Sequence, residues 1–355
     1  MSRFLTPKFS NLTPYVPGEQ PQDMQYTKLN TNESPFPPPP EVVESMREAG
    51  SSANLYCDPT CKALCEAIAG IYGVKPENVL PVNGSDEILN FAIMAFCDEN
   101  HPLAYADITY GCYPVFADFN HVPSHIIPLK DDFTIDYRDY CGLNETIVIA
   151  NPNAPTGMVM KKSEIEEILR SNPDNVVIID EAYVAFGAES CIDLIEKYDN
   201  LLVAQTFSKS HSLAGARLGF GFANPALLAD INAIKYSTNP YNVNRMAQAA
   251  GVAAAKVNDY FLSNCRTIEE NRAYTAAGLK EMGFTVLPSY ANFIFAKTDR
   301  MEGGTLYQTL KQRGVLIRHF KKERISDYLR ITIGTKEQME IFLQTTREIL
   351  NEKEN

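Results

Sequence analysis

The sequence lacks a basic segment, a long apolar run and a leader-like terminus. Its 355 residues carry 32 Lys and Arg against 44 Asp and Glu, which gives a net charge of −12 at pH 7. Binding to nucleic acid or to an anionic membrane needs a basic patch, so we expect neither as a partner. No apolar run approaches the length of a membrane span, and no apolar stretch follows Arg3 near the amino terminus. We therefore expect a cytoplasmic protein.

The sequence also lacks the spacings of a disulfide framework, a metal site or a nucleotide-binding loop. Its eight cysteines are predicted to be reduced thiols. Cys57, Cys61 and Cys65 are four residues apart, which predicts one helix face, but no Cys-x-x-Cys pair or nearby histidine accompanies them. Gly219 and Gly221 have no third glycine of a dinucleotide fingerprint, and no Gly-x-x-x-x-Gly-Lys loop is present. We expect no metal, and a nucleotide-dependent enzyme is disfavoured.

The chain is longer than one hydrophobic core usually grows, and its composition changes along its length. Prolines at several positions in residues 1–40 predict an extended arm. We expect a large domain at 41–245 and a small carboxyl-terminal domain at 246–355, with the change between Tyr236 and Asp259. The predicted fold class is α/β: a mostly parallel sheet covered by helices on both faces, with a smaller α+β domain and an extended amino-terminal arm.

Short apolar runs rich in β-branched residues predict buried strands at 146–150, 176–179 and 201–205, with a helix at 163–170 between the first two. A further strand is expected at 219–223. Helices are predicted at 41–49, at 60–72, from about 85 to 96 and from about 259 to 282. The carboxyl-terminal part is expected to contain strands at 292–297 and 329–333 and helices at 305–313 and 336–350.

The most informative stretch follows the strand at 201–205: Thr206-Phe207-Ser208-Lys209-Ser210-His211-Ser212-Leu213-Ala214-Gly215-Ala216-Arg217. Lys209 comes just past the carboxyl end of a strand, where open α/β sheets bind their ligands. A lysine in a partly apolar site beside another cation, here Arg217, is held neutral and can attack an aldehyde. This pattern predicts a Schiff-base lysine. A solvated loop lysine is the alternative for Lys209 taken alone.

Asp180 ends the strand at 176–179, so its carboxylate would project from the same sheet edge. A buried carboxylate in that place is what keeps the pyridine nitrogen of pyridoxal phosphate protonated. Magnesium binding is the alternative for Asp180, but the phosphate loop such a site would serve is missing. Tyr183 is a candidate to hydrogen-bond the phenolic oxygen of this cofactor, with core packing as its alternative.

The phosphate and ring of such a cofactor also need partners. Ser85 and Asp86 begin the helix predicted from about 85 to 96, whose first amide groups could bind an anion, although an ordinary capped helix start would look the same. Ser208 and Arg217 could add a hydroxyl and a two-pronged cation. Tyr110 is a candidate to stack against the ring.

Four segments together resemble the fold-type-I pyridoxal-phosphate aminotransferases, and within them the histidinol-phosphate branch. The resemblance spans nearly the whole chain with the motifs in family order, and it is carried by Lys209 with its surroundings, by Asp180-Glu181-Ala182-Tyr183, by Asn151-Pro152-Asn153-Ala154-Pro155-Thr156-Gly157 and by Leu329-Arg330-Ile331-Thr332-Ile333-Gly334.

The resemblance implies roles for individual residues. Lys209 would bond the aldehyde of the cofactor and then carry a proton between the substrate and the cofactor. Arg330 would grip the anionic end of the substrate, a task suited to its rigid fork. Arg318 and Tyr15 match an arginine and an arm tyrosine near a substrate phosphate. Tyr56 is similar to a tyrosine that reaches the cofactor phosphate of the partner, which implies a homodimer.

The chain departs from the family pattern at Ala154, where an asparagine usually hydrogen-bonds the phenolic oxygen of the cofactor. Asn151 or Asn153 could compensate, and we predict Asn153 as a cofactor ligand. The implied reaction moves the amino group of histidinol phosphate to 2-oxoglutarate, a small-molecule amine and a 2-oxo acid, in histidine biosynthesis. The alternatives are an aromatic amino acid aminotransferase, an O-phosphothreonine decarboxylase and a regulator that binds the cofactor without catalysis.

Overall fold

The computed structural model describes residues 2–352 and divides them between two packed bodies joined by a long helix. The first body contains α1 (Pro40–Gly50), α2 (Lys62–Tyr72), β2 (Val79–Val82), α3 (Ser85–Phe96), β3 (Leu103–Ala106), α4 (Cys112–Asn120), β4 (Ser124–Ile127), β5 (Thr146–Ala150), α5 (Lys162–Ser171), β6 (Val177–Asp180), β7 (Leu201–Thr206), β8 (Gly219–Ala223), α6 (Pro225–Thr238) and α7 (Arg245–Lys256).

The central sheet of this body has seven strands in the order β2-β8-β7-β6-β5-β3-β4. The strands from β7 through β6, β5 and β3 to β4 are parallel, whereas β8 runs antiparallel to both β7 and β2. The mostly parallel sheet is confirmed, and the strand expected at 219–223 is its antiparallel member. The reversal follows from the short connection between β7 and β8, which has no crossover helix.

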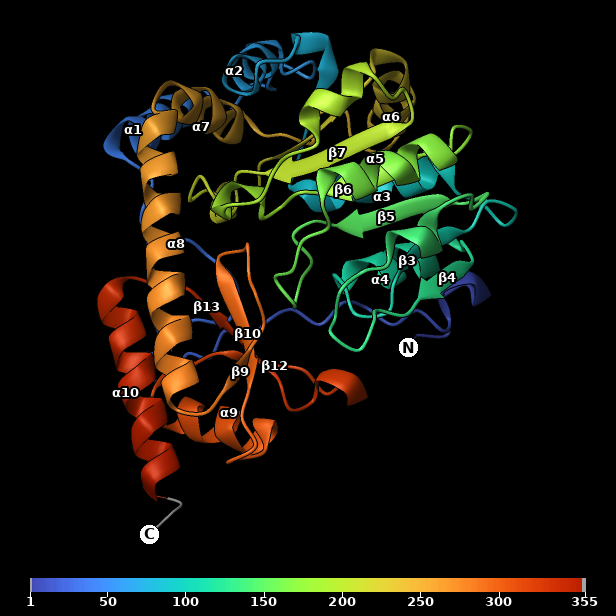
Figure 1. Cartoon of the computed structure of the whole chain (residues 1–355). Helices are drawn as coiled ribbons and strands as arrows, with labels where there is room; N and C mark the ends of the chain where they lie inside the picture. Colours follow the sequence, from blue (N-terminus) through green and yellow to red (C-terminus); the bar gives the residue numbers. More distant parts are fainter. Residues whose placement is uncertain (1, 353–355) are drawn as a thin grey trace.

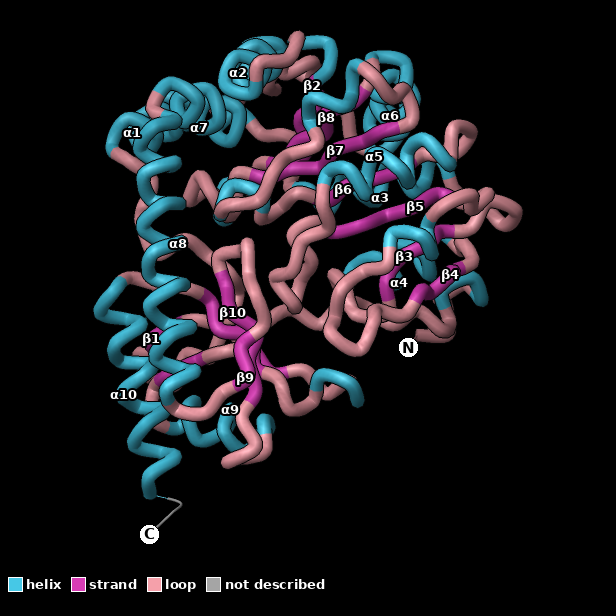
Figure 2. Tube along the Cα trace, in the orientation of Figure 1, coloured by secondary structure: helices cyan, strands magenta, loops and turns pink. Residues whose placement is uncertain are grey.

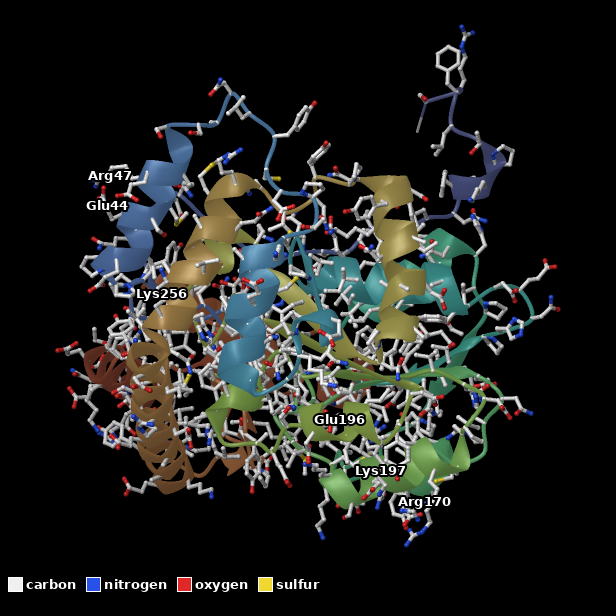
Figure 3. All side chains as sticks on the ribbon, turned by 90° about the horizontal axis from the view of Figure 1, so that it is seen from above. Glu44, Arg47, Arg170, Glu196, Lys197 and Lys256 are labelled. Carbon is white, nitrogen blue, oxygen red and sulfur yellow. The ribbon has the colours of Figure 1, made fainter. Side chains whose placement is uncertain are left out.

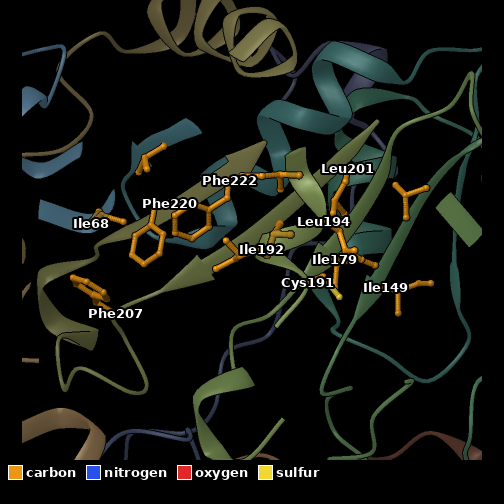
Figure 4. Close-up of a cluster of buried hydrophobic side chains, with 14 of the residues drawn as sticks. Ile68, Ile149, Ile179, Cys191, Ile192, Leu194, Leu201, Phe207, Phe220 and Phe222 are labelled. Atoms are coloured by element: carbon orange, nitrogen blue, oxygen red, sulfur yellow. The ribbon is translucent and has the colours of Figure 1, made fainter. Parts of the chain in front are cut away.

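Residues alternate between the two faces of this sheet. Helices cover both faces (Figure 2). Ile149, Ile179 and Val203 belong to one buried cluster with Phe207, Phe220 and Phe222, shown in part in Figure 4. Val148, Ile178 and Leu202 face the other side, in a cluster with residues of α3, α4 and α6. Burial on both faces explains the nearly continuous apolar runs of these strands.

Charged side chains lie on the outer surfaces of the covering helices. Figure 3 shows Glu44 and Arg47 of α1 at the edge of the molecule, paired at 2.8 Å, and Arg170 of α5 on the opposite edge. Such exposed pairs contribute little to stability, ~0.5 kcal/mol or less each. The hydrophobic faces of the helices therefore supply most of what holds them on the sheet.

The second body is built around a four-stranded antiparallel sheet in the order β12-β13-β10-β9. Its elements are β9 (Thr285–Val286), β10 (Phe293–Lys297), α9 (Gly303–Gln312), β11 (Val315–Leu316), β12 (Arg318–His319), β13 (Leu329–Thr332) and α10 (Lys336–Glu352). The helix α8 (Asn258–Glu281) links the bodies, since Phe261 packs in the first core while Ile268 and Leu279 pack in the second (Figure 1).

The amino-terminal arm crosses from one body to the other. Phe9 stacks on Phe119 of α4 at 5.5 Å, whereas β1 (Thr27–Lys28) pairs in parallel with β11. Leu29 is buried in the carboxyl-terminal core. The domain limits drawn from the sequence remain a prediction, but the end of the arm packs as part of the second body.

One local expectation was wrong. Cys57, Cys61 and Cys65 do not share a helix face, because α2 begins at Lys62 and only Cys65 lies within it. Cys61 precedes the helix in a left-handed conformation with φ of 52°. The spacing of four residues gave a helical pattern where Pro59 and the turn before α2 prevent a helix.

Candidate active site

A cavity of about 400 Å³ lies at the carboxyl ends of β3, β5, β6 and β7, between the two bodies and the arm. Parallel strands carry ligand sites at this edge because the connecting loops there are free to shape a crevice. The predicted site residues that line the cavity are Tyr15, Ser85, Asp86, Tyr110, Asp180, Tyr183, Ser208, Lys209, Arg217, Arg318 and Arg330.

Lys209 lies in the turn after β7, half-buried in the cavity wall. Burial and, after it, the nearby Arg330 and Arg217 guanidinium groups lower the pKa of its amine to about 8, against the opposing effect of Glu33 and Asp86. The Nζ donates a hydrogen bond to the carbonyl oxygen of Thr31 at 3.3 Å. A substantial fraction of this amine is therefore neutral near pH 8, as nucleophilic and proton-transfer roles require.

Asp180 ends β6 and points to the side of the sheet that α4 covers. Its Oδ2 accepts a hydrogen bond from the Tyr113 hydroxyl at 2.8 Å, and its Oδ1 accepts one from the Ala182 amide at 3.2 Å. Burial raises its pKa to about 6, although the Tyr113 hydrogen bond opposes the rise. Asp180 forms no ion pair with any residue of the 2–352 range. A buried carboxylate facing a cavity without its own cation suits a ligand that brings one.

The amino terminus of α3 forms one end of the cavity. Ser85 and Asp86 open the helix, and the Asp86 carboxylate accepts from Tyr110 at 2.8 Å and from Arg217 at 3.3 Å. Gly84 has a φ of 84°, and a Cβ there would overlap the Arg217 guanidinium. Helix amides, serine hydroxyls and an arginine are the donors that bind a phosphate, and Ser208 adds another hydroxyl to this set.

Two arginines lie at the end of the cavity toward the carboxyl-terminal body. Arg330 donates to the carbonyl oxygen of Asn30 at 3.0 Å, and its Nε is buried without a partner among the described residues. Arg318 donates to the carbonyl oxygens of Val16 and Pro17, both at 3.3 Å, which fixes the arm over the site. Each guanidinium has further N–H groups, so this end of the cavity can bind a second anion.

Aromatic side chains narrow the space between the two cationic ends. The ring of Tyr15 lies 6.1 Å from that of Tyr110. Phe320 also lines the cavity, with the Arg330 guanidinium 5.6 Å from its ring centre. Tyr183 packs edge-on against Phe293 at 5.0 Å, and its hydroxyl accepts a hydrogen bond from the Asn32 amide at 2.9 Å. A flat ring fits between such walls.

Two predicted site residues do not line this cavity. Asn153 lies behind its wall: its Oδ1 accepts from Thr109 at 2.8 Å, and its Nδ2 donates to the Ile108 carbonyl oxygen at 2.9 Å. Tyr56 is 79 % exposed and stacks on Tyr241, with ring centres 4.4 Å apart. Within a single chain Tyr56 is therefore outside the site that the other residues form.

Both asparagines near Ala154 are hydrogen-bonded to other residues of the chain. Asn151 uses both ends of its amide on Met160, accepting from the amide at 2.8 Å and donating to the carbonyl oxygen at 3.2 Å. Asn153 is saturated as described. Neither amide lines the cavity beside Ala154, because Met160 of the same loop engages Asn151, and Ile108 and Thr109 engage Asn153.

The structure adds cavity residues that the sequence did not suggest. Tyr113 orients Asp180, Lys322 lines the rim, and Asn30, Thr31 and Asn32 of the arm approach Arg330, Lys209 and Tyr183 in turn. Tyr113 follows the predicted site residue Tyr110 by three residues, and this spacing could have indicated from the sequence that Tyr113 belongs to the site. No such indication exists in the sequence for residues 30–32 of the arm, because the residues that they contact are far away in the chain.

The donors in the cavity fit pyridoxal phosphate. The α3 terminus with Ser208 and Arg217 suits the phosphate, Asp180 suits a protonated ring nitrogen, and Lys209 supplies the amine. The second pair of cations, Arg318 and Arg330, is left for a substrate. Tyr15, Tyr110 and Phe320 line the space between the two ends.

Comparison with known proteins agrees with this geometry. Residues 25–345 match the model of the family "Aminotransferase class I and II". A histidinol-phosphate aminotransferase of Brachyspira hyodysenteriae is 47% identical over 99% of this chain and 99% of its own length. One of Acinetobacter baumannii is 46% identical over 98% of this chain and 97% of its own.

The fold matches a solved structure along nearly its full length. The histidinol-phosphate aminotransferase of Sinorhizobium meliloti, solved in complex with pyridoxal-5'-phosphate, superposes with a TM-score of 0.87 at 22% identity and covers 99% of each chain. With the family model and full-length relatives well above 30% identity, the chain belongs to the class I and II aminotransferases.

Proposed function

We propose that this chain is a pyridoxal-phosphate-dependent aminotransferase that moves the amino group of histidinol phosphate to 2-oxoglutarate. The observation that carries the proposal is one cavity with two separate anion sites, the α3 terminus with Arg217 at one end and Arg318 with Arg330 at the other. A cofactor phosphate and an anionic substrate would occupy one each. The names of the full-length relatives support the choice of substrate.

Pyridoxal phosphate, when bound, supplies an aldehyde and a ring that delocalises the electron pair left when a substrate carbon loses a proton. Asp180 would hold the positive charge of the ring nitrogen, because a buried carboxylate without an ion-pair partner gains most from an adjacent cation. Ser85, Ser208 and Arg217 would hold the phosphate, and Tyr183 would donate to the ring oxygen.

Lys209 is placed to move the proton. Its pKa of about 8 leaves part of the amine neutral near neutral pH, so its Nζ can accept a proton from the carbon that bears the substrate amino group. The same Nζ can return a proton when the second substrate is converted. Because Arg330 and Arg217 lower this pKa, they favour the base form throughout the cycle.

Arg330 and Arg318 would orient both substrates. Histidinol phosphate offers a phosphate and no carboxylate, whereas 2-oxoglutarate offers two carboxylates, so one pair of cations must serve both kinds of anion. The Nε of Arg330, which is buried and has no partner among residues 2–352, supports this use, since an anion would satisfy it. Tyr15 and the arm carbonyls bound to Arg318 would close the site against water.

We infer a homodimer in the cytoplasm, in which Tyr56 reaches the cofactor phosphate of the partner. Tyr56 is exposed and held by stacking on Tyr241, and Arg245 donates to its carbonyl oxygen, so a protruding ring has a fixed place. The eight cysteines, all within the described range, are free thiols, which fits a reducing compartment. No helix within residues 2–352 is long and apolar enough to cross a membrane.

The test incubates the purified protein, loaded with pyridoxal phosphate, with histidinol phosphate and 2-oxoglutarate, and measures glutamate. We expect turnover that the variants Arg318→Gln and Arg330→Gln reduce mainly through a higher KM for the phosphorylated amine. A higher kcat/KM for phenylalanine or tyrosine than for histidinol phosphate would overturn the substrate assignment. Release of carbon dioxide from O-phosphothreonine would identify the decarboxylase instead.

A further inference from the structure

Three consecutive residues of the arm contact three different groups of the active site. The carbonyl oxygen of Asn30 accepts from Arg330 at 3.0 Å, and that of Thr31 accepts from Lys209 at 3.3 Å. The side chain of Asn32 donates to the hydroxyl of Tyr183 at 2.9 Å. Of the three, only Asn32 acts through its side chain, so only this contact can be changed by substitution without moving the backbone.

Asn32 is held in one orientation. It is 1 % exposed and adopts a φ of 56°, a left-handed conformation that asparagine tolerates better than most residues. Its Oδ1 accepts a hydrogen bond from the Thr332 hydroxyl at 2.9 Å, and its backbone amide donates to the hydroxyl oxygen of Thr332 at 3.0 Å. Its carbonyl oxygen accepts from Asn292 at 3.0 Å. Because Thr332 binds Oδ1, the NH₂ group of Asn32 faces Tyr183.

This orientation determines what the Tyr183 hydroxyl can do. An amide NH₂ has only hydrogens to offer, so the tyrosine oxygen accepts from Asn32 and its own hydrogen must point elsewhere. Tyr183 lines the cavity, and within residues 2–352 no hydrogen bond to its hydroxyl is found other than the one that Asn32 donates. The hydrogen is therefore available for an acceptor inside the cavity.

The loop that carries Ala154 makes this donor more important, because Tyr183 packs against the same buried cluster as Ala154. Ala154 has no polar side chain, and the amides of Asn151 and Asn153 are engaged by Met160, Thr109 and Ile108. A ring oxygen bound near Tyr183 would thus receive no amide hydrogen bond from that loop. The Tyr183 hydroxyl would then have to donate to this oxygen without help from a second side chain.

We propose that Asn32 is a positioning residue: its amide directs the hydrogen of Tyr183 at the phenolic oxygen of the cofactor, in compensation for Ala154. The proposal rests on the proposed function, since it requires pyridoxal phosphate in the cavity. A hydrogen bond to the phenolic oxygen stabilises its anionic form. It therefore weakens the hold of this oxygen on a proton that it would share with the Lys209 nitrogen bonded to the cofactor. Loss of the directed donor should therefore raise the pKa of the bound cofactor's visible absorption band.

The test titrates this band with pH in the wild type, Asn32→Gly, Tyr183→Phe and the double variant. Glycine removes the amide and accepts the left-handed φ. Asn32→Gly should raise the pKa of the band by about 0.5–1 unit, the scale of one lost hydrogen bond. In the Tyr183→Phe background the same substitution should cause no further shift, because the hydroxyl through which Asn32 acts is gone.

A second variant keeps the test decisive if Asn32→Gly folds poorly. Thr332→Val removes the hydroxyl that orients the Asn32 amide and keeps the side-chain shape, so it should shift the band in the same direction. An unchanged band pKa in both variants, or an equal shift with and without the Tyr183 hydroxyl, would overturn the proposal. If the wild type forms no visible band with pyridoxal phosphate, the proposed function fails first, which separates the two outcomes.

Discussion

Asp180 and Glu181 are adjacent carboxylates with opposite surroundings. The alternation at the end of β6 places Asp180 at the cavity, whereas Glu181 accepts from Ser190 and the Cys191 amide, both at 2.6 Å, and from Gln205 at 2.8 Å. Burial raises both pKa values, to about 6 and about 7, against their hydrogen bonds. Glu181 is satisfied by the protein, and Asp180 is kept for a ligand.

This difference predicts opposite effects of neutralising the two residues. The folded-state pKa of Asp180 is raised, so its charged form disfavours the fold, and stability falls as pH rises from about 4 to 6. Asp180→Asn should therefore stabilise the cofactor-free protein at pH 8 by about 1–3 kcal/mol. It should also lower kcat by about 100-fold or more, because the ring nitrogen loses its counter-charge.

The measurement is urea unfolding of the cofactor-free protein at pH 8 and at pH 4, together with turnover of the loaded enzyme. The difference in stability should shrink at pH 4, where Asp180 is neutral in the fold. Glu181→Gln is the matched control. The NH₂ group of the glutamine would face groups that donate hydrogen bonds to Glu181, so this substitution should destabilise the fold. Equal stability of Asp180→Asn and wild type at pH 8 would contradict the assignment of a buried, unpaired charge.

At the scale of elements, a buried histidine, His211, connects the turn after β7 to α8 by a hydrogen bond and by ring packing. The His211 ring stacks on Phe207 at 3.9 Å and lies 4.7 Å from Phe261, while its Nε2 is 3.0 Å from the Asn258 oxygen. Burial lowers its pKa to about 4 from 6.5. The turn that carries Lys209 thus depends on a neutral imidazole.

This contact predicts loss of stability in acid. An unfolded chain takes up the proton near pH 6.5 and the folded one only near 4, so the contribution of His211 is complete above 6.5 and lost as pH falls between these values. The loss should reach about 2–3 kcal/mol. Urea midpoints from pH 8 to 4 would measure it. His211→Gln keeps an amide in place of the ring, and its stability should fall less steeply; parallel curves would refute the prediction.

The approach of β8 to the start of α3 forms the proposed phosphate site. Gly219 lies so close to α3 that a Cβ would overlap the backbone amide of Ser85 and the carbonyl carbon of Gly84. Gly219→Ala should force these elements apart, lower the affinity for pyridoxal phosphate at least about 10-fold and cost about 1–3 kcal/mol of stability. Absorbance titration with the cofactor and urea unfolding measure the two effects.

Gly70 provides the control for that substitution. It is exposed in α2, and a Cβ there meets nothing within 4 Å. Gly70→Ala should leave cofactor affinity unchanged and stabilise the fold by about 0.5–1 kcal/mol, since alanine has the higher helix propensity. If Gly219→Ala bound the cofactor as tightly as Gly70→Ala, the close packing of β8 on α3 would have no role in the site.

At the scale of the whole molecule, the site is made by three separate parts of the chain. The sheet edge supplies Lys209 and Asp180, the carboxyl-terminal body supplies Arg318 and Arg330, and the arm lies across both. Tyr56 is exposed and does not line this cavity. A partner subunit is the remaining place where Tyr56 can fulfil its predicted role.

A hybrid dimer tests this arrangement. In a mixture of Lys209→Ala and Tyr56→Ala subunits, a site that borrows Tyr56 from its partner would be intact once in every hybrid, since Lys209 would come from one chain and Tyr56 from the other. Activity should rise after subunit exchange above that of either variant alone. Activity no higher than the sum of the unmixed variants would show that Tyr56 does not act across subunits.

The strands of the sheet and the placement of Lys209 and Asp180 were predictable, because apolar runs and the polar residues that end them are local features of the chain. The contacts of the arm were not. Asn32 and Thr332 are 300 residues apart, and Lys209 and Thr31 are 178 apart. Hydrophobic periodicity does not indicate contacts between residues so far apart in the chain. The proline-rich arm also has no apolar face of its own that would indicate where it binds.

The amino-acid sequence by itself determined the layered sheet and the residues at its carboxyl edge, since burial on both faces demands apolar runs and a ligand site demands polar ends. Only the tertiary structure decided that Asn153 bonds to Thr109 and Ile108, that Asn32 faces Tyr183 and that Arg318 holds the arm. The physical reason is that a hydrogen bond depends on position and direction in space, and packing of distant segments sets both.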